Sequence, residues 1–220
     1  LVGQTRKPTR QPTIRDLMTH TAGLTYGVFG NTEVDQAYRE AGLLGDMDLK
    51  AFVTALGKLP LQYDPGSQWH YSVSVDVQGY LVEVLSGMKF SEFLQQRIFG
   101  PLDMKDTAFK VNEGNKDRLT QLYKPEGVTA GNFFAPSTGD GLEVADAFVS
   151  AGYIYGSKFE SGGGGLIATA RDYLSFSQMM LNGGVLHGVR ILSPKTVDLM
   201  TTNHIGDLGL IFGRKGIGFG

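Results

Sequence analysis

The chain has 220 residues, of which 41% are hydrophobic and 19% charged, and its formal net charge at pH 7 is −2. These values are typical of a globular protein, and no basic run or acidic tail indicates a nucleic-acid partner. No apolar segment approaches the roughly 20 residues that a membrane-spanning helix requires. The chain contains no cysteine, which excludes disulfides, thiolate catalysis and cysteine-ligated zinc but does not distinguish cytoplasm from periplasm.

Short helices ended by glycines are the predicted pattern of the N-terminal part. Thr13 and Asp16 have the spacing of a capping box, and they predict a short helix that stops near Gly23. A helical patch is expected at Val34–Arg39, inside a glycine-dotted loop. Asp48 is expected to cap a helix whose apolar face consists of Leu49, Phe52, Val53 and Leu56.

A turn and a longer helix are expected next. Tyr63–Gly66 has the composition of a turn. The stretch from about Ser74 to Leu85 predicts a helix that Gly87 ends. Its predicted apolar face consists of Val77, Leu81, Val84 and Leu85. Ser91 is expected to cap the following helix, which stops at Gly100.

The remaining sequence is patterned unevenly. Residues 103–160 predict short strands or loops. Four elements are then expected in order: a helix with the capping pair Thr169 and Asp172, a hairpin turn at His187–Gly188, a helix that starts at Ser193–Pro194, and the start of a strand within 205–220.

The histidines do not predict a metal site. None of the four is paired with another histidine or a carboxylate at the helical spacing that metal sites use, so we expect no metal and no cofactor. His20 has two possible roles, as a catalytic base or as a structural histidine near a helix end. The structural role is favoured, because a lone histidine has no orienting partner in view.

Two other motifs have a structural and a chemical interpretation. The only Ser-x-x-Lys spacing is Ser86-Gly-Met-Lys89, which could place a lysine beside a nucleophilic serine. Gly87 is expected to end the helix inside this motif, so a turn between helices is favoured. The four glycines at 162–165 could cradle a phosphate, but no Lys-Ser or Lys-Thr follows them. A tight passage of the backbone is therefore favoured there.

Tyr71 precedes a predicted helix and follows a Pro-Gly turn. The positive end of a helix favours a phenolate over a phenol, so a tyrosine in this place can act as a general base. The alternative is a packed aromatic side chain, and from the residues alone that alternative is favoured.

Four segments in order resemble one family. Residues 13–24, TIRDLMTHTAGL, resemble the signature ITIRDLLTHTSGL of the serine β-lactamase-like hydrolases, the group of class C β-lactamases and family VIII esterases. Three further segments resemble that family's motifs in the same order: YDPGSQWHYS at 63–72, FSEFL…IFGPLDMKDT at 90–107, and GGGLIATARD at 163–172.

The resemblance implies an α+β fold of the β-lactamase/transpeptidase type. It implies that 1–160 form mostly the helical lobe and that 161–220 return into the α/β lobe, as parts of one parent domain whose antiparallel sheet is largely missing here. It also implies a mechanism in which a serine of a Ser-x-x-Lys motif forms an acyl-enzyme, and Tyr71 matches the family's catalytic tyrosine. Val73 stands where β-lactamases usually carry a substrate-binding asparagine, which favours an esterase for short acyl esters.

The ends of the chain complete these expectations. In the family the Ser-x-x-Lys helix precedes the first matched segment by some tens of residues, so the nucleophile is expected outside this chain, which begins with Leu1. A class C-type β-lactamase or D-amino-acid peptidase is the first alternative, and an inert binding lobe is the second. The expected partner is a small ester or lactam, and neither the oligomeric state nor the bacterial compartment is predicted.

Overall fold

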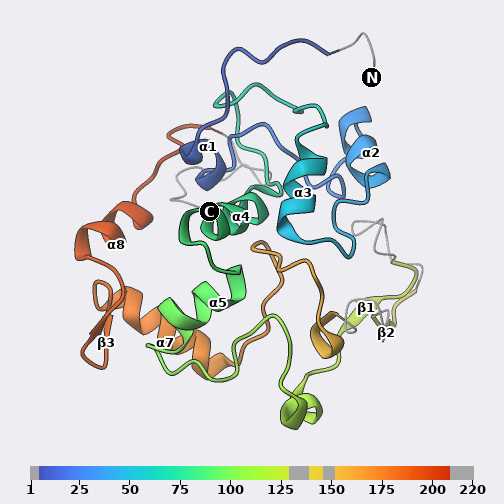
Figure 1. Cartoon of the computed structure of the whole chain (residues 1–220). Coiled ribbons are helices and arrows are strands. Elements are labelled where there is room, and N and C mark those ends of the chain that lie inside the picture. The colour runs from blue at the N-terminus through green and yellow to red at the C-terminus, as the bar shows by residue number, and fades with distance from the viewer. Residues whose placement is uncertain (1–4, 129–138, 146–151, 209–220) are drawn as a thin grey trace.

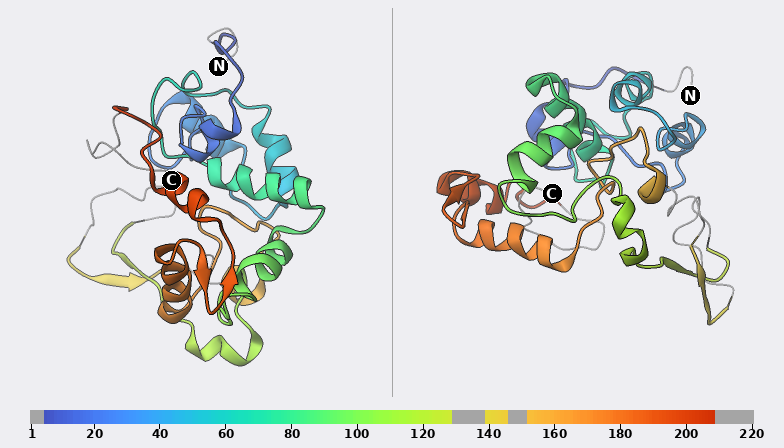
Figure 2. Two further views of the ribbon diagram at one scale, coloured as in Figure 1. Left: turned by 90° about the vertical axis from the view of Figure 1, so that its left-hand side faces the viewer. Right: turned by 60° about the horizontal axis from the view of Figure 1, so that its bottom comes forward.

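The computed structural model describes residues 5–128, 139–145 and 152–208. Helices dominate, and α1 to α4 gather at one end of the molecule, as Figure 1 shows. Helices α7 and α8 lie at the other end with the strands β3 and β4, and α5 lies between the two groups. The strands β1 and β2 project on the opposite side from α7 and α8, which Figure 2 shows from two further directions.

The elements have the following bounds. The helices are α1 (Ile14–Met18), α2 (Glu33–Glu40), α3 (Leu49–Leu56), α4 (Ser74–Ser86), α5 (Phe90–Leu94), a π-helical turn (Gln95–Phe99), a 3-10 helix (Glu113–Arg118), α7 (Ala170–Leu181) and α8 (Pro194–Thr201). The strands are β1 (Tyr123–Pro125), β2 (Leu142–Val144), β3 (Val185–Leu186) and β4 (Val189–Arg190).

The strands of the described residues form two antiparallel pairs. In the first, Lys124 of β1 lies opposite Glu143 of β2. In the second, β3 and β4 form a hairpin whose turn residues His187 and Gly188 both have positive φ, at 48° and 79°. A type I′ turn requires two such residues, so the predicted hairpin is confirmed. Helices with small antiparallel sheets make an α+β fold, as the sequence predicted.

Side-chain caps begin the N-terminal helices where the sequence predicted them. Thr13 Oγ accepts from Asp16 N at 3.2 Å, and the Asp16 carboxylate accepts from Thr13 N at 2.7 Å, which completes the capping box of α1. Asp48 accepts from Ala51 N at 2.7 Å and caps α3. Helix α1 nevertheless ends at Met18, one turn before the predicted stop at Gly23. The reason is a left-handed residue at position 20, which closes the helix early.

Asp16 also joins the N-terminal segment to α1, and this contact predicts a pH dependence. Its carboxylate is buried and receives two hydrogen bonds from the Arg10 guanidinium, at 2.6 and 2.8 Å. These bonds hold the pKa of Asp16 well below its usual range. A lowered pKa in the folded state adds stability above the unfolded pKa of about 4, and this stability is lost as the pH falls.

We therefore expect Asp16→Asn to lower the free energy of unfolding by about 1–3 kcal/mol at pH 7. The difference between the variant and the unaltered protein should shrink as the pH falls from 5 to 3, because the unfolded chain takes up a proton at Asp16 in this range whereas the folded protein does not. Thermal unfolding of both proteins over this pH range measures the difference. A difference that stays constant across the range would contradict the argument.

Two clusters of buried apolar side chains form the core. The first joins α2, α3, the segment after α1 and the start of α4; its buried members are Ala22, Leu24, Tyr38, Leu43, Phe52, Leu56 and Val73. The second joins α7, β3 and the chain that follows α5; its buried members are Phe99, Leu102, Met104, Met179 and Leu186. The first cluster lies under the segment that carries Tyr71, so packing there supports the predicted site.

The predicted apolar face of α4 is wrong in part. Val84 and Leu85 are 60% and 80% exposed, whereas Asp76 and Gly79 are buried. Gly79 is buried because it lets α4 approach its neighbours: a Cβ there would lie 3.3 Å from the Phe90 ring. Asp76 is buried because several hydrogen-bond donors surround it.

Ser91 does not cap α5, contrary to the prediction. The helix begins at Phe90, and Lys89 occupies the cap position without a side-chain hydrogen bond. Ser91 instead donates from its hydroxyl and its backbone N–H to Glu160, both at 2.7 Å. The carboxylate of Glu160, which is distant in the sequence, therefore accepts the hydrogen bonds of a serine that the local pattern predicted to cap the helix.

Candidate active site

Tyr71 lies in the segment that enters α4. The turn before it is closed by a hydrogen bond from Ser67 N to Asp64 O at 3.0 Å, as the composition of 63–66 predicted. Helix α4 begins at Ser74 with Val73 as its N-cap, and Val73 supplies no side-chain hydrogen bond to the first turn. The positive end of α4 therefore lies just beyond Tyr71, and the carboxylate of Asp76 lies in its first turn.

Aromatic side chains surround the half-buried ring of Tyr71. Their ring centroids lie at 5.0 Å for His20, 5.2 Å for Tyr26, 5.6 Å for Phe29 and 6.3 Å for Trp69. The Trp69 ring is close to parallel with it, at an interplanar angle of 18°. Four neighbours from two separate segments fix the direction of the Tyr71 side chain, which a general base requires.

A buried carboxylate contacts this aromatic group through Tyr26. Asp76, in the first turn of α4, accepts hydrogen bonds from Ser161 Oγ at 2.6 Å, Gly163 N at 3.2 Å and Tyr26 Oη at 3.4 Å. Burial raises the pKa of Asp76, and these donors oppose the increase. Burial also raises the pKa of Tyr26, followed by the charge of Asp76 and by Tyr71. Tyr26 thus stays a neutral phenol between the carboxylate and Tyr71.

Two of the glycines at 162–165, Gly162 and Gly163, pass tightly along the first turn of α4. A Cβ on Gly162 would overlap the carbonyl oxygen of Val75, and one on Gly163 would overlap the hydroxyl of Tyr26. The N–H of Gly163 is already bonded to Asp76. This confirms the predicted tight backbone passage, and it leaves the phosphate interpretation without support.

This close approach predicts the effect of a single methyl group. Gly162→Ala should displace the 161–165 segment from α4 and lower stability by about 1–3 kcal/mol, as overpacking does. Gly164→Ala is the matched control, because a Cβ at Gly164 meets nothing within 4 Å. Urea unfolding of the two variants compares them directly. Equal midpoints for both variants would show that the close approach does not matter.

His20 is buried, at 2% exposure, and makes structural contacts. Its Nδ1 accepts from Ser72 N at 3.3 Å. Burial, and then the charge of His70, lowers the pKa of His20 to about 4, so the ring is neutral at pH 7. These contacts support the structural role that the sequence favoured over catalysis.

Val73 is completely buried and belongs to the first core cluster. In this structure its side chain packs beside Phe52 and Leu24 in that cluster. A substrate contact at position 73 therefore stays a prediction.

Ser86 and Lys89 lie at the far end of α4 from Tyr71. The helix has 13 residues, so at about 1.5 Å per residue its ends are roughly 18 Å apart. Ser86 Oγ donates to Val82 O at 2.6 Å and accepts from Met88 N at 3.1 Å, and Gly87 caps the helix with φ 70°. The predicted turn is confirmed, and Ser86 does not meet Tyr71.

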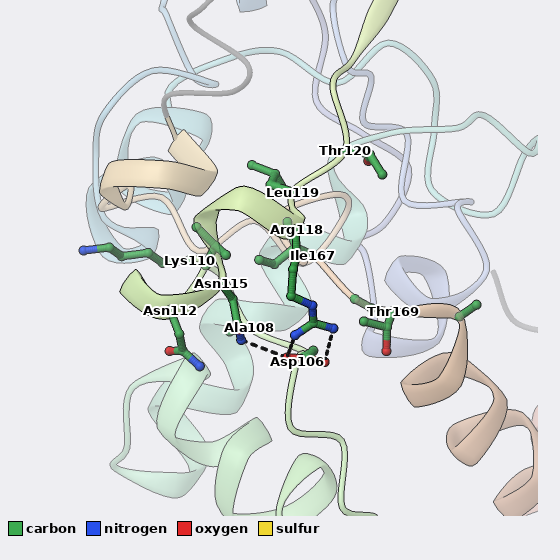
Figure 3. Close-up of a pocket in the computed structure, with 13 residues that line it drawn as sticks. Asp106, Ala108, Lys110, Asn112, Asn115, Arg118, Leu119, Thr120, Ile167 and Thr169 are labelled. Atoms are coloured by element: carbon green, nitrogen blue, oxygen red, sulfur yellow. Dashed lines mark hydrogen bonds and ion pairs between the residues drawn. The ribbon is translucent and has the colours of Figure 1, made fainter.

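A separate cavity of about 330 Å³ lies between the 3-10 helix and the start of α7. Figure 3 shows Asp106 within it, where the carboxylate receives two hydrogen bonds from Arg118, at 2.9 and 2.8 Å, and one from Asn115 at 3.0 Å. The Arg118 guanidinium lowers the pKa of Asp106. No residue around Tyr71 lines this cavity, so it is distinct from the candidate site.

The described part of the chain contains no group of three or more side chains that could hold a metal ion. Within the same residues, no helix is long and apolar enough to cross a membrane.

Sequence reasoning missed the neighbours of Tyr71. Trp69 carries a local signal, because it lies two residues before Tyr71 in the same matched segment. Tyr26 and Phe29 carry none, since they reach Tyr71 through the packing of the loop after α1. Asp76 carries a weak one: a carboxylate in a first helical turn is common on exposed helices as well.

The chain belongs to the Beta-lactamase family, because the model of that family matches residues 3–212. It is 31% identical over 194 residues to Protein Rv1367c of Mycobacterium tuberculosis, covering 88% of this chain and 45% of that protein. It is 29% identical over 170 residues to Esterase EstB of Burkholderia gladioli, covering 74% of this chain and 42% of that protein.

A solved structure supports the same family. EstCE1, described as a hydrolase with promiscuous acyltransferase activity, is similar to this chain with a TM-score of 0.75 and 25% identity. The match covers 94% of this chain and 55% of EstCE1. The chain thus spans about half the length of these relatives.

Proposed function

We propose that the complete protein containing this chain is a serine carboxylesterase that acts on short acyl esters, and that Tyr71 is its general base. The observation that carries the proposal is the placement of Tyr71, packed among four aromatic neighbours in the segment that leads directly into α4. The family membership and the similarity to Esterase EstB support an ester substrate.

The proposed reaction has two steps. A serine Oγ attacks the ester carbonyl while Tyr71 Oη, beside the lysine of a Ser-x-x-Lys motif, accepts the serine proton. The alcohol leaves with a proton returned by the same groups, and an acyl-enzyme remains. Water then attacks the acyl-enzyme while Tyr71 accepts a proton from it, and Tyr71 returns this proton to the serine Oγ as the carboxylic acid is released. Backbone N–H groups stabilise the oxyanion in both steps.

The nucleophile is proposed to lie in sequence outside these 220 residues. The one Ser-x-x-Lys of the chain has Ser86 bonded at the far end of α4, roughly 18 Å along the helix from its start. A fluorophosphonate probe tests this point. We expect stoichiometric labelling of the complete protein at a serine of another Ser-x-x-Lys, and none of the 220-residue chain alone. Labelling of Ser86 would refute the proposal, and a complete protein without any adduct would support the inert binding lobe.

Val73 bears on the choice between ester and lactam. The family's β-lactamases carry an asparagine at this position for the amide of the lactam side chain, and a buried valine cannot form that hydrogen bond. We therefore expect the complete protein to hydrolyse p-nitrophenyl butyrate much faster than a chromogenic cephalosporin. Rapid cephalosporin hydrolysis with poor ester turnover would favour the β-lactamase or D-amino-acid peptidase instead.

A further inference from the structure

The segment after α1 runs beside the segment that leads to Tyr71. Three backbone hydrogen bonds join the two: Gln62 N donates to Gly23 O at 2.7 Å, Gly66 N to Thr21 O at 2.7 Å, and His70 N to His20 O at 2.8 Å. The last of them reaches the residue immediately before Tyr71. Residues 20–23 of the first matched segment and residues 62–70, which overlap the second, are thus one hydrogen-bonded unit.

His20 extends this unit past Tyr71 with its side chain. The ring Nδ1 accepts from Ser72 N at 3.3 Å, and Ser72 Oγ lies 3.3 Å from the same nitrogen. Ser72 Oγ also contacts Ser74 Oγ at 2.8 Å, at the start of α4. The backbone N–H groups on both sides of Tyr71 therefore donate to the same residue. His70 N donates to the His20 carbonyl oxygen, and Ser72 N donates to the His20 ring.

The backbone of His20 adopts a conformation that makes this double contact possible. Its φ is 52°, in the left-handed region that residues other than glycine seldom occupy and that costs about 1–2 kcal/mol. Histidine and asparagine tolerate this region better than most residues. The ring is neutral at pH 7, and in the tautomer with its proton on Nε2 the Nδ1 lone pair accepts from Ser72 N.

We propose that His20 is a positioning residue for Tyr71, which it holds by accepting the backbone N–H groups of His70 and Ser72. The inference rests on the proposed function of Tyr71. A general base must stay within hydrogen-bond reach of the proton it accepts, and a displacement of about 1 Å can cost about 100-fold in rate. His20 acts at the backbone, so it sets the position of the phenol without touching the substrate.

Two substitutions in the complete protein separate the acceptor from the ring. His20→Phe keeps an aromatic ring beside Trp69 and Tyr71 but removes the acceptor for Ser72 N. His20→Asn loses the ring but places its amide oxygen near the position of Nδ1, and asparagine tolerates the left-handed backbone. The readouts are kcat and KM for p-nitrophenyl butyrate, with kcat expressed per serine that a fluorophosphonate can titrate.

We expect His20→Phe to lower kcat per titrated serine about 10- to 100-fold with KM nearly unchanged. His20→Asn should recover most of this loss. A purely structural role would instead reduce the number of titratable serines and leave kcat per serine unaltered, and that result would overturn the inference. Equal losses in both variants would overturn it as well, because they would mean that the imidazole itself takes part in the reaction.

Tyr71→Phe, assayed in parallel, separates the two proposals. Full turnover by Tyr71→Phe would refute both the proposed role of Tyr71 and this inference. If Tyr71→Phe were inactive and His20→Phe fully active, only the inference about His20 would be refuted. If His20→Phe does not fold, nitrogen-15 NMR of the unaltered protein still decides: we expect Nδ1 of His20 to be unprotonated at pH 7, and a protonated Nδ1 would overturn the inference.

Discussion

Replacing Tyr71 with phenylalanine is expected to lower kcat for p-nitrophenyl butyrate about 100- to 10,000-fold, the usual contribution of general acid–base catalysis. The substitution removes one oxygen and keeps the ring, so the contacts with His20, Tyr26 and Trp69 remain. We therefore expect little change in KM or in the thermal midpoint. Steady-state kinetics of the complete protein, with the serine titrated by a fluorophosphonate, measure the effect.

Tyr80→Phe is the matched control, since Tyr80 lies within α4 and the same oxygen is removed there. Its kcat should equal that of the unaltered protein. If Tyr71→Phe also kept full activity, Tyr71 would be a packed aromatic residue, the alternative that its residue context alone favoured. A loss of activity accompanied by an equal loss of thermal stability would likewise argue for packing rather than catalysis.

The parts of the fold that the sequence predicted are those that local chemistry determines. The capping box at Thr13 and Asp16 and the cap at Asp48 need only residues within one helical turn, and both are present. The same holds for the stop of α4 at Gly87, where a left-handed residue ends a helix. Signals of this kind survive folding because their partners are already adjacent in the chain.

The predictions that failed depend on partners distant in sequence. Ser91 is of a residue type that often caps helices, but its hydroxyl donates to Glu160, 69 residues further along the chain. Asp76 has the polarity of an exposed residue, yet Ser161 and Gly163 satisfy it in the interior. A hydrophobic pattern assigns such a position to solvent because it does not include the donors that tertiary structure brings to it.

The candidate site shows the same difference between local and distant partners. Tyr71 was identified through a motif at 63–72 together with the order of the other matched segments, and its place before α4 follows from local pattern. The side chains that hold it, Tyr26 and His20, come from the segment after α1. Their positions depend on hydrogen bonds between two segments some fifty residues apart, such as the one from Ser72 N to the His20 ring, which no local pattern specifies. The sequence therefore pointed to the candidate general base and did not specify the side chains packed around it.

The core beneath this support should be sensitive to the loss of one ring. Phe52 is completely buried in the first cluster, with Leu24 and Val73 among its members, and its ring centroid lies 5.0 Å from that of Phe159. Leu24 and Val73 belong to the segments that carry His20 and Tyr71. Phe52 thus packs α3 against both halves of the candidate site.

We expect Phe52→Ala to lower the free energy of unfolding by about 3–5 kcal/mol, because it loses buried apolar surface and leaves a cavity. That is a large share of the roughly 5–15 kcal/mol that stabilises a typical domain. Phe52→Leu is the control and should cost about 1.5 kcal/mol or less, since it keeps most of the volume. Urea unfolding of the three proteins measures the series. If Phe52→Ala cost no more than Phe52→Leu, the ring would not be the packing element that joins α3 to the Tyr71 segment, and the rigidity of the site would have to come from the backbone hydrogen bonds at His20 alone.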